Sequence, residues 1–426
     1  MSEAEWVSLC FVADITMGQS PDSIFVNNQE IGLPFLQGCA EFGARHPLPK
    51  VYCNPPLRIA KNNSILISVR APVGTANFSD QDYCIGRGLA AIKAKSGLAE
   101  TMYLKYVIEN NISFLHRRSQ GSTFLAISSA DLNAFKIPNL QINKQNKIAA
   151  ILNSIDTAIE KTESLIAKYQ KIKAGLMHDL FTRGVTADGK LRPPREQAPE
   201  LYQETPVGWI PVEWEFDSIS SIMESLIDGP FGSNLKTEHY VIDPGVRVVR
   251  LQNIQATSYN DNDRAYVSDK HAAFLLRNKV LSGDILIAGL GEDRYPVGRA
   301  CLYPDNLPPA INKADCFRLR CKVDEAENPF VMLYLNTEPA RVQIRKYEQG
   351  VTRPRINSGN FKKLIIPKPS IKEQKLIAGQ IMKVAEIIEA ERKRNHKFIM
   401  EKLGLMQDLL TGKVPVKIDK PDQELV

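Results

Sequence analysis

The 426-residue sequence predicts an α+β protein made of one duplicated unit: two domains with twisted sheets, separated by two long antiparallel helices that form a coiled-coil spacer. Three observations lead to this prediction. One segment matches a later segment at a fixed offset, both copies show the periodicity of an amphipathic helix, and short β-rich runs precede each copy. The duplication implies a pseudo-twofold internal repeat.

The internal repeat aligns residues 121–185 with residues 350–414 at a constant offset of 229, because 350 − 121 = 229. Pro138 pairs with Pro367 in this register, which continues over about 65 residues without a gap. Chance does not keep one register over such a length. Upstream of the match the two halves are only faintly alike, so each unit is a variable globular part followed by a similar C-terminal part.

The variable parts are expected to be mixed α+β domains over residues 1–143 and 213–369. Short runs rich in β-branched residues, such as Ser64–Val69, alternate with Gly, Pro and Asn, which is typical of strands joined by turns. A helix is expected from Glu100 to about Leu115, with a counterpart near Pro329–Tyr347. Each domain should therefore carry a curved sheet and at least one helix.

The similar parts are expected to be helical over residues 144–183 and 370–413. Apolar residues recur there at i, i+3, i+4 and i+7 over about five heptads, and each helix would measure roughly 54 Å. One helix cannot bury such a stripe alone, so the two should pack on each other; two ordinary bundle helices are the alternative. The expected packing positions are Ile148, Ile155, Ile159, Ile166, Tyr169, Leu176, Ile377, Val384, Ile388, Phe398 and Leu405.

Two further segments have the composition of connectors. Residues 184–212 begin with a polar, proline-rich stretch, which is typical of a linker between the repeated units. Residues 414–426 form a polar tail, which is expected to fray.

The composition indicates a cytoplasmic globular protein. The formal charge of +6 permits nucleic-acid binding without proving it. The seven cysteines have irregular spacings without a nearby histidine pair, which favours ordinary thiols over a zinc site. The acidic N-terminus is unlike a signal peptide, and no stretch is apolar enough to span a membrane.

One motif suggests catalysis. Asn54-Pro55-Pro56-Leu57 resembles the Asn-Pro-Pro-aromatic loop of amino-group DNA methyltransferases, in which the aromatic residue stacks on an extruded base. Leu57 cannot stack in this way, and no glycine-rich turn suited to S-adenosylmethionine precedes the motif. The sequence also lacks a phosphate-binding loop, a nuclease-like set of acids and a histidine with metal or triad spacing. We therefore expect no catalytic or metal site in this chain.

Polar and basic loop residues of the variable parts are the candidates for nucleic-acid contact. Arginine and lysine bind phosphates, while arginine, glutamine and asparagine also pair with base edges. Two loops at equivalent places in the repeat keep a glycine and a threonine between basic residues, at 117–123 and 345–355. The candidates are Gln19, Ser20, Lys61, Asn63, Arg70, Arg87, Arg117, Arg118, Gln120, Ser122, Thr123, Arg250, Gln252, Asn253, Arg294, Arg299, Lys313, Arg345, Lys346, Gln349, Thr352, Arg353 and Arg355.

The order of these parts resembles the specificity subunit of type I restriction–modification systems. The resemblance rests on a variable domain, a Pro-x-x-x-Ile-x-x-Gln helix start, a linker, and then the same two parts again. The helix starts are at 138–145 and 367–374, and Gly-Leu-Met-x-Asp-Leu near both helix ends supports them, at 175–180 and 404–409. Each motif alone is weak, but their order and duplication cover essentially the whole chain.

The resemblance implies a function. Each variable part would be a target-recognition domain that reads one half of a bipartite, asymmetric duplex DNA site, and the paired helices would set the spacer between the halves. Two modification (methyltransferase) subunits, which carry S-adenosylmethionine, would dock on the chain. Restriction (translocase and nuclease) subunits, which use ATP and Mg, would join them. The chain itself would bind no cofactor.

Two other interpretations of the sequence remain open. The chain could be a fused methyltransferase and recognition protein with Asn54 in its active site, in which case it would bind S-adenosylmethionine by itself. It could instead be a structural coiled-coil adaptor, in which case it would show no sequence preference on duplex DNA.

Overall fold

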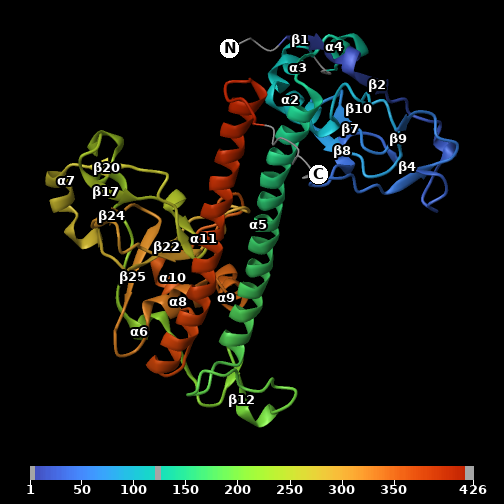
Figure 1. Cartoon of the computed structure of the whole chain (residues 1–426). Coiled ribbons are helices and arrows are strands. Elements are labelled where there is room, and N and C mark those ends of the chain that lie inside the picture. The colour runs from blue at the N-terminus through green and yellow to red at the C-terminus, as the bar shows by residue number, and fades with distance from the viewer. Residues whose placement is uncertain (1–4, 120–125, 418–426) are drawn as a thin grey trace, which may run out of the picture. The chain divides into compact units, whose positions relative to one another are not determined.

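The computed structural model describes residues 5–119 and 126–417, which belong to two compact units (Figure 1). The first unit comprises residues 1–166 and 390–426, and the second comprises residues 167–389. Each unit holds one mixed domain together with parts of two long helices, α5 (Ile142–Thr182) and α11 (Ile371–Leu410). The predicted fold class, with two α+β domains and two long helices, is confirmed.

The domain of the first unit contains two sheets. A four-stranded sheet has the order β2-β10-β7-β8, and a five-stranded sheet has the order β3-β5-β4-β9-β6. The pair β1–β11 connects the start of the domain to the segment before α5. The elements are β1 (Trp6–Ser8), α1 (Leu9–Val12), β2 (Ala13–Met17), β3 (Val26–Asn27), β4 (Leu33–Leu36), η2 (Cys39–Glu41), β5 (Val51–Cys53), β6 (Ile59–Ala60), β7 (Ile65–Ser68), β8 (Ala76–Phe78), β9 (Tyr83–Ile85), β10 (Leu89–Ala94), α2 (Thr101–Asn110), α3 (Ile112–Arg118), α4 (Ser129–Asn133) and β11 (Lys136–Pro138).

The domain of the second unit repeats this topology. Its four-stranded sheet has the order β15-β25-β22-β23, its five-stranded sheet has the order β16-β20-β17-β24-β21, and β14–β26 matches β1–β11. The one parallel pairing in each five-stranded sheet also corresponds, β4 with β9 and β17 with β24. The elements are β14 (Glu215–Ser218), α6 (Ile219–Ile222), β15 (Met223–Ile227), β16 (Tyr240–Val241), β17 (Val246–Val249), η6 (Leu251–Asn253), β18 (Ile254–Gln255), β19 (Ser258–Tyr259), β20 (Tyr266–Val267), α7 (Asp269–Phe274), η7 (Leu276–Asn278), β21 (Lys279–Val280), β22 (Ile285–Ala288), β23 (Ala300–Leu302), β24 (Ala310–Asn312), β25 (Cys316–Cys321), α8 (Asn328–Leu335), α9 (Glu338–Tyr347), α10 (Ser358–Phe361) and β26 (Ile365–Lys368).

Strands β7 and β22, each an inner strand of its four-stranded sheet, are buried on both faces, which explains their continuous apolar sequences. Successive side chains of a strand point to opposite faces. In β22, Ile285 and Ile287 pack into the core that contains the helices, whereas Leu286 packs into a second core against the other sheet. Residues 65–67 of β7 divide in the same way between two cores. Each four-stranded sheet therefore lies between helices on one face and the five-stranded sheet on the other.

Each domain carries two short consecutive helices where a single longer helix was expected. Around residues 100–118, α2 ends at Asn110 and α3 begins at Ile112. In the second unit, α8 ends at Leu335 and α9 begins at Glu338. Asn111 has the conformation φ −113°, ψ 23°, which interrupts the first pair. The apolar residues of both helices are buried together, so the sequence pattern did not reveal the break.

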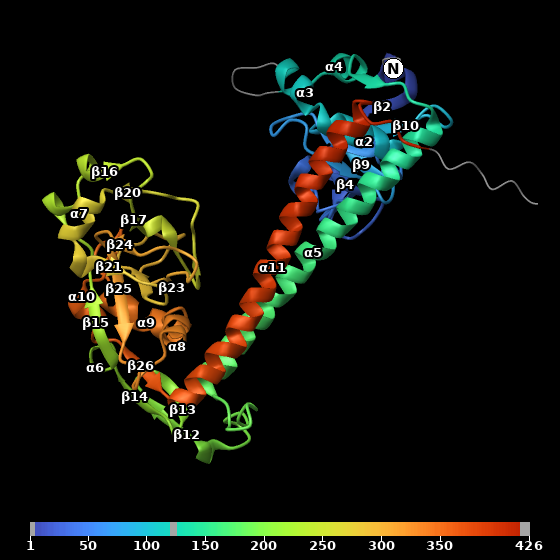
Figure 2. The same ribbon diagram turned by 60° about the vertical axis from the view of Figure 1, so that its left-hand side comes forward.

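Helices α5 and α11 run antiparallel, side by side in both views (Figures 1 and 2). In the first unit, the beginning of α5, at Ile148 and Leu152, packs with the end of α11, at Met406 and Leu409. In the second unit, the end of α5 packs with the beginning of α11 at Ile377. The helices contain 41 and 40 residues and lie within about three residues of the expected helical ranges, 144–183 and 370–413. Burial is greatest at the two ends. Of the expected packing positions, Ile148, Ile377 and Ile388 are buried, and Ile155, Ile159, Ile166, Tyr169, Leu176, Val384, Phe398 and Leu405 are half-buried.

The glutamine of each repeated motif attaches a long helix to its domain. The Gln145 side chain donates to the carbonyls of Leu98 (3.2 Å) and Leu140 (2.7 Å) and accepts from the N–H of Glu100 (3.0 Å). Gln374, its copy in the repeat, is bonded in the same way. It donates to the carbonyls of Glu325 (3.3 Å) and Pro369 (2.9 Å) and accepts from the N–H of Glu327 (2.8 Å). Both residues are 1% exposed, so these hydrogen bonds are shielded from water.

We expect Gln145→Met and Gln374→Met each to lower the free energy of unfolding of its unit by about 2 kcal/mol, because buried backbone groups lose their partners while the side-chain volume is kept. Urea denaturation measures the change. The matched control is Gln141→Met, since Gln141 is exposed just before α5 and should change stability by less than about 0.5 kcal/mol. Equal effects of all three substitutions would contradict the attachment role.

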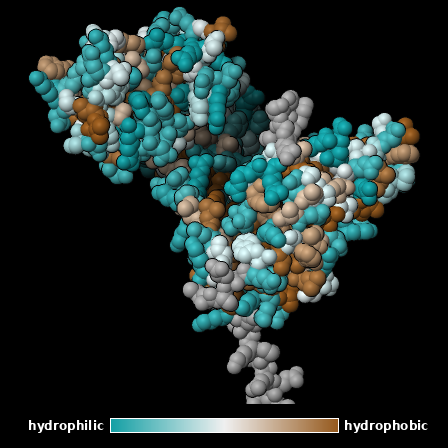
Figure 3. Space-filling view, turned by 90° about the horizontal axis from the view of Figure 1, so that it is seen from above, coloured by the Kyte–Doolittle hydropathy of each residue, from teal (hydrophilic) through white to brown (hydrophobic). Residues whose placement is uncertain are grey.

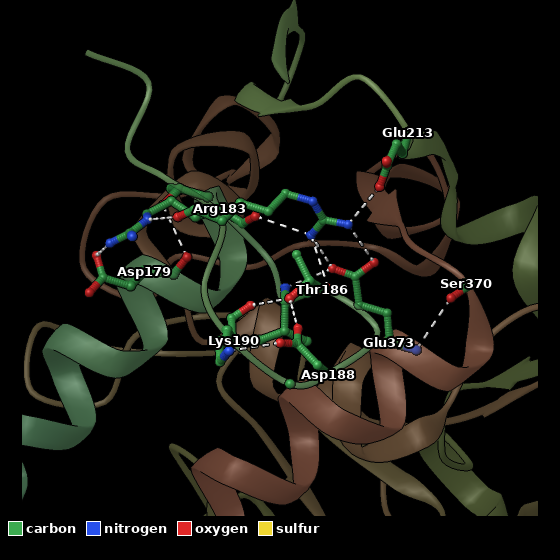
Figure 4. Close-up of polar contacts among 12 residues, drawn as sticks. Asp179, Arg183, Thr186, Asp188, Lys190, Glu213, Ser370 and Glu373 are labelled. Carbon is green, nitrogen blue, oxygen red and sulfur yellow. Dashed lines mark hydrogen bonds and ion pairs between the residues drawn. The ribbon is translucent and has the colours of Figure 1, made fainter. Parts of the chain in front are cut away.

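The segment between the two repeats, residues 184–212, was predicted as a linker and is packed within the second unit. It contains the hairpin of β12 (Tyr202–Thr205) and β13 (Gly208–Pro211). Arg192 is 7% exposed and donates to Glu373 of α11 at 2.6 Å and to Glu213 at 2.7 Å. Figure 4 shows the carboxylates of Glu213 and Glu373 directed toward one guanidinium group. The backbone N–H of Val185 also donates to Glu373, at 2.8 Å. Burial opposes the charge of Arg192, but the hydrogen bonds to both glutamates outweigh it and raise the pKa of the guanidinium.

Candidate nucleic-acid interface

Two loops of the second unit are joined at the edge of the four-stranded sheet. One connects β22 to β23 over residues 289–299, and the other follows α9 over residues 348–357. The N–H of Gly291 donates to the carbonyl of Pro354 at 3.0 Å, and the N–H of Ile356 donates to Gly289 at 2.9 Å. Leu290 and Arg355 also form an isolated β-bridge. The loop that the sequence singled out is therefore held against a second loop.

The first unit keeps the same junction. The N–H of Ile127 donates to the carbonyl of Val69 at 2.9 Å, and Arg70 forms a β-bridge with Ala126. Ala126 corresponds to Arg355 in the repeat, since 355 − 126 = 229. Gln120, Ser122 and Thr123 of the same loop lie outside the described residues. The repeat thus places equivalent loops at equivalent positions on two domains.

The remaining candidates of the first unit lie on its surface. Ser20 accepts a hydrogen bond from the side chain of Gln37 at 3.0 Å and one from the N–H of Arg87 at 3.3 Å, which brings three loops together. The sequence did not single out Gln37. Lys61 pairs with Asp82 at 2.9 Å, and Arg118 lies over the ring of Phe114 and 3.6 Å from Asp131. The exposed candidates here are Gln19, Lys61, Asn63, Arg70, Arg87, Arg117 and Arg118.

Three candidates of the second unit are used inside the domain. Asn253 is fully buried, and its side chain donates to the carbonyls of Asn260 and Asp263, both at 2.8 Å. Arg250 forms an ion pair with Asp263. Arg299 is 5% exposed and bonds to backbone carbonyls. The sequence named all three as candidates for nucleic-acid contact, and in the structure their side chains bond within the domain and hold loops in place.

The other candidates of the second unit are exposed or half-buried. Arg294 lies over the ring of Tyr295, Lys313 lies over Tyr240, and Arg345 pairs with Glu338. Arg355 pairs with Asp315 and lies over the ring of Phe231. Lys313 is half-buried, whereas the exposed set is Gln252, Arg294, Arg345, Lys346, Gln349, Thr352, Arg353 and Arg355.

A half-buried carboxyl group, that of Asp228, lies beside these loops and was not among the sequence candidates. Asp228 accepts hydrogen bonds from the N–H groups of Gly229 (2.7 Å) and Asp315 (3.0 Å). Gly229 allows a close approach, because an added Cβ would lie 1.9 Å from the carbonyl carbon of Lys313. Burial raises the pKa of Asp228 to about 6, although the N–H of Gly229 favours the carboxylate.

The raised pKa of Asp228 predicts a pH dependence of stability. The folded chain holds this proton more tightly than the unfolded chain, whose value is near 3.8, so the contribution is largest below about pH 4 and is lost as the pH rises through about 6. Allowing for solvent screening, we expect a loss of about 1 kcal/mol. Urea denaturation of the wild type and of Asp228→Asn between pH 4 and pH 7 measures it. An identical slope in both would contradict the assignment.

The motif that suggested catalysis lies at the surface. Asn54–Leu57 forms the connection between β5 and β6, and Asn54 and Leu57 are exposed. Among the described residues, no group of three or more His, Cys, Asp and Glu is placed to hold a metal ion. Within the same described part of the chain, no helix is long and apolar enough to cross a bilayer. On the face drawn in Figure 3, hydrophilic side chains predominate, and hydrophobic ones lie among them in small groups.

The fold and these loops define a class of protein: a duplicated protein with two domains of one topology that present different loops. The sequence model of the family described as type I restriction modification DNA specificity domain matches residues 53–168 and 211–397. The chain therefore belongs to the family of type I restriction–modification specificity subunits, whose role is DNA target recognition.

Individual relatives agree with this assignment. The provisionally named MjaX type I restriction enzyme specificity subunit of Methanocaldococcus jannaschii is 39% identical over 178 residues, which span 42% of this chain and 40% of that relative. The MjaVIII specificity subunit of the same organism is 24% identical and covers 84% of this chain and 81% of its own length. The crystal structure of the type I S subunit from M. genitalium has the same fold, with a TM-score of 0.64 at 15% identity, covering 96% of this chain and 97% of that chain.

Proposed function

We propose that the chain reads a bipartite, asymmetric duplex DNA target, with one half-site for each domain. The observation that supports this proposal most is that the two domains share one topology but present different loops. The junctions at Arg70–Ala126 and Leu290–Arg355 correspond, whereas the side chains around them differ. Basic and amide side chains in such loops suit phosphate and base-edge contacts. Two domains that recognise different half-sites, held by one framework, would together recognise one long, asymmetric DNA sequence.

The paired helices set the distance between the half-sites in this proposal, and they dock two modification subunits. Exposed apolar side chains on α11 support docking, since Ile399, Met400 and Leu403 are 38%, 54% and 55% exposed. The modification subunits would supply S-adenosylmethionine, and the restriction subunits would supply ATP-driven chemistry with Mg. The chain itself acts without a cofactor and without catalysis, as a recognition subunit of a cytoplasmic complex.

Methylation mapping tests the proposal. Co-expression of the chain with its modification subunits, followed by sequencing of modified bases, should reveal one bipartite motif with two unlike half-sites. A continuous motif, or no motif on duplex DNA, would overturn the proposal, and the second result would favour a structural adaptor. S-adenosylmethionine binding by the chain alone should be absent, because saturable binding that is lost in Asn54→Ala would favour the fused methyltransferase.

A further inference from the structure

A cleft of about 500 Å³ opens between three loops of the second unit. One wall comes from η6, β18 and the residue after β19, with Gln252, Gln255 and Asn260, and the opposite wall comes from residues 290–292 and Tyr295. Arg353 of the repeated loop closes one side. The cleft is therefore built at the loop junction that both domains share.

Arg299 fixes the shape of this cleft from below. Its Nε donates to the carbonyl of Ile254 at 2.8 Å, one terminal nitrogen donates to Tyr295 at 3.0 Å, and the other donates to Leu251 at 3.0 Å. These bonds join the two walls through one rigid, planar group. Burial lowers the pKa of Arg299, and nearby groups, with the Glu292 carboxylate among them, oppose this shift. Within the described part of the chain no ion pair joins Arg299 to Glu292, so the cleft holds a buried cation at its floor and a carboxylate on its wall.

The cleft belongs to the part of the fold in which the two domains differ. The connection between β7 and β8 has seven residues, 69–75, whereas the connection between β22 and β23 has eleven, 289–299. Both contain Pro-Val-Gly directly before their last residue, at 72–74 and 296–298, so the extra residues of the second domain fall at 291–294. Thr75 occupies the place of Arg299. The framework is common, but this wall and its supporting arginine occur in the second domain alone.

Three exposed side chains around the cleft keep their hydrogen-bonding groups free. Within the described part of the chain, the side chains of Gln252, Glu292 and Arg353 have no hydrogen bond or ion pair to another residue. Gln252 is held through its backbone instead, because its carbonyl accepts from the side chains of Gln255 (3.0 Å) and Asn260 (3.2 Å). A carboxylate such as Glu292 would repel DNA phosphates, but it can accept from the exocyclic amino group of a base.

We propose that this cleft reads base edges of the second half-site in the major groove. Glu292 accepts a hydrogen bond from an amino group of cytosine or adenine, Gln252 pairs with a base edge through its amide, and Arg353 donates to a guanine or a nearby phosphate. The choice of a carboxylate gives selectivity, because a base that presents only acceptors there is repelled. This inference rests on the proposed function and names the residues that give the second domain its own sequence preference.

Methylation mapping with the complete modification complex tests the cleft. Glu292→Gln and Gln252→Ala should relax or change one or more positions of one half-site by about tenfold in relative methylation, while the other half-site keeps its sequence. Glu224→Gln is the matched control, because Glu224 is exposed on β15 away from the cleft and should leave both half-sites unchanged. The melting temperature of each variant monitors folding.

The possible outcomes separate this inference from the function on which it rests. An unchanged motif in both cleft variants would overturn the inference and leave the proposed function intact. Equal loss at both half-sites with an unchanged melting temperature would also overturn it, because the cleft would then contact DNA without reading bases. A wild-type complex without any bipartite motif would overturn the proposed function itself.

Discussion

Arg192→Met is expected to lower the free energy of unfolding of the second unit by about 3–5 kcal/mol. The substitution leaves Glu373, whose residue is 9% exposed, as a buried carboxylate without its cation. The lost contact is short, at 2.6 Å, and both side chains are almost fully buried. Isosteric loss of one member of a buried pair costs more than the pair contributes, because the remaining charge stays out of water.

Urea denaturation followed by tryptophan fluorescence measures this effect where it occurs. Trp214 is 2% exposed in the core of the second unit, so its emission reports the unfolding of that unit. Glu213→Gln is the control, because Glu213 also lies 2.7 Å from Arg192 but its side chain is 71% exposed, and its loss should cost less than about 1 kcal/mol. The double variant Arg192→Met/Glu373→Leu should recover most of the stability. A loss below 1 kcal/mol in Arg192→Met would show that the pair does not anchor the segment.

The buried pair explains why the sequence suggested a linker where the structure has an anchored segment. Proline-rich polar composition predicts an extended connector, but it does not show that one arginine meets a glutamate 181 positions away. Gly184 contributes to the same packing. Its φ is +62°, and an added Cβ would lie 2.4 Å from both Glu373 Oε1 and Trp214 Cζ2. Such tertiary contacts between distant residues leave no periodic trace in the sequence.

The sequence predicted the framework of long helices and central strands well, because this framework is periodic and is repeated in the chain. The helical stripe, the apolar strands and the glutamines at 145 and 374 follow local rules, and duplication doubles each signal. The reading surface follows no such rule. Arg299 and Asn253 looked like base-reading side chains in the sequence, yet both are buried and bond to backbone carbonyls. Glu292 was not among the sequence candidates, because a single exposed glutamate forms no pattern in the sequence. Only the structure places it at the wall of a cleft.

Removing one heptad from each long helix is expected to shorten the preferred spacer between the half-sites by about three base pairs. Deletion of residues 163–169 and 387–393 takes equal lengths from α5 and α11. Seven residues of helix rise about 10 Å, and DNA rises about 3.4 Å per base pair. Three base pairs also turn the duplex by about 100°, since one turn takes about 10 to 10.5 base pairs. We therefore expect the affinity for the new optimum to fall at least tenfold.

A library of duplexes with the same half-sites and graded spacers measures this shift. The half-site sequences should stay unchanged, because the deletion leaves the loops at Arg70 and Leu290 intact. Deletion from α5 alone is the control, and it should abolish assembly, since the ends of α5 would then no longer match their partners on α11 at both cores. An unchanged spacer after the paired deletion would mean that the helices do not set the distance. Altered half-site sequences would mean that the helices also take part in reading bases. That result would contradict the proposal that the domains read the bases and the helices only set the distance.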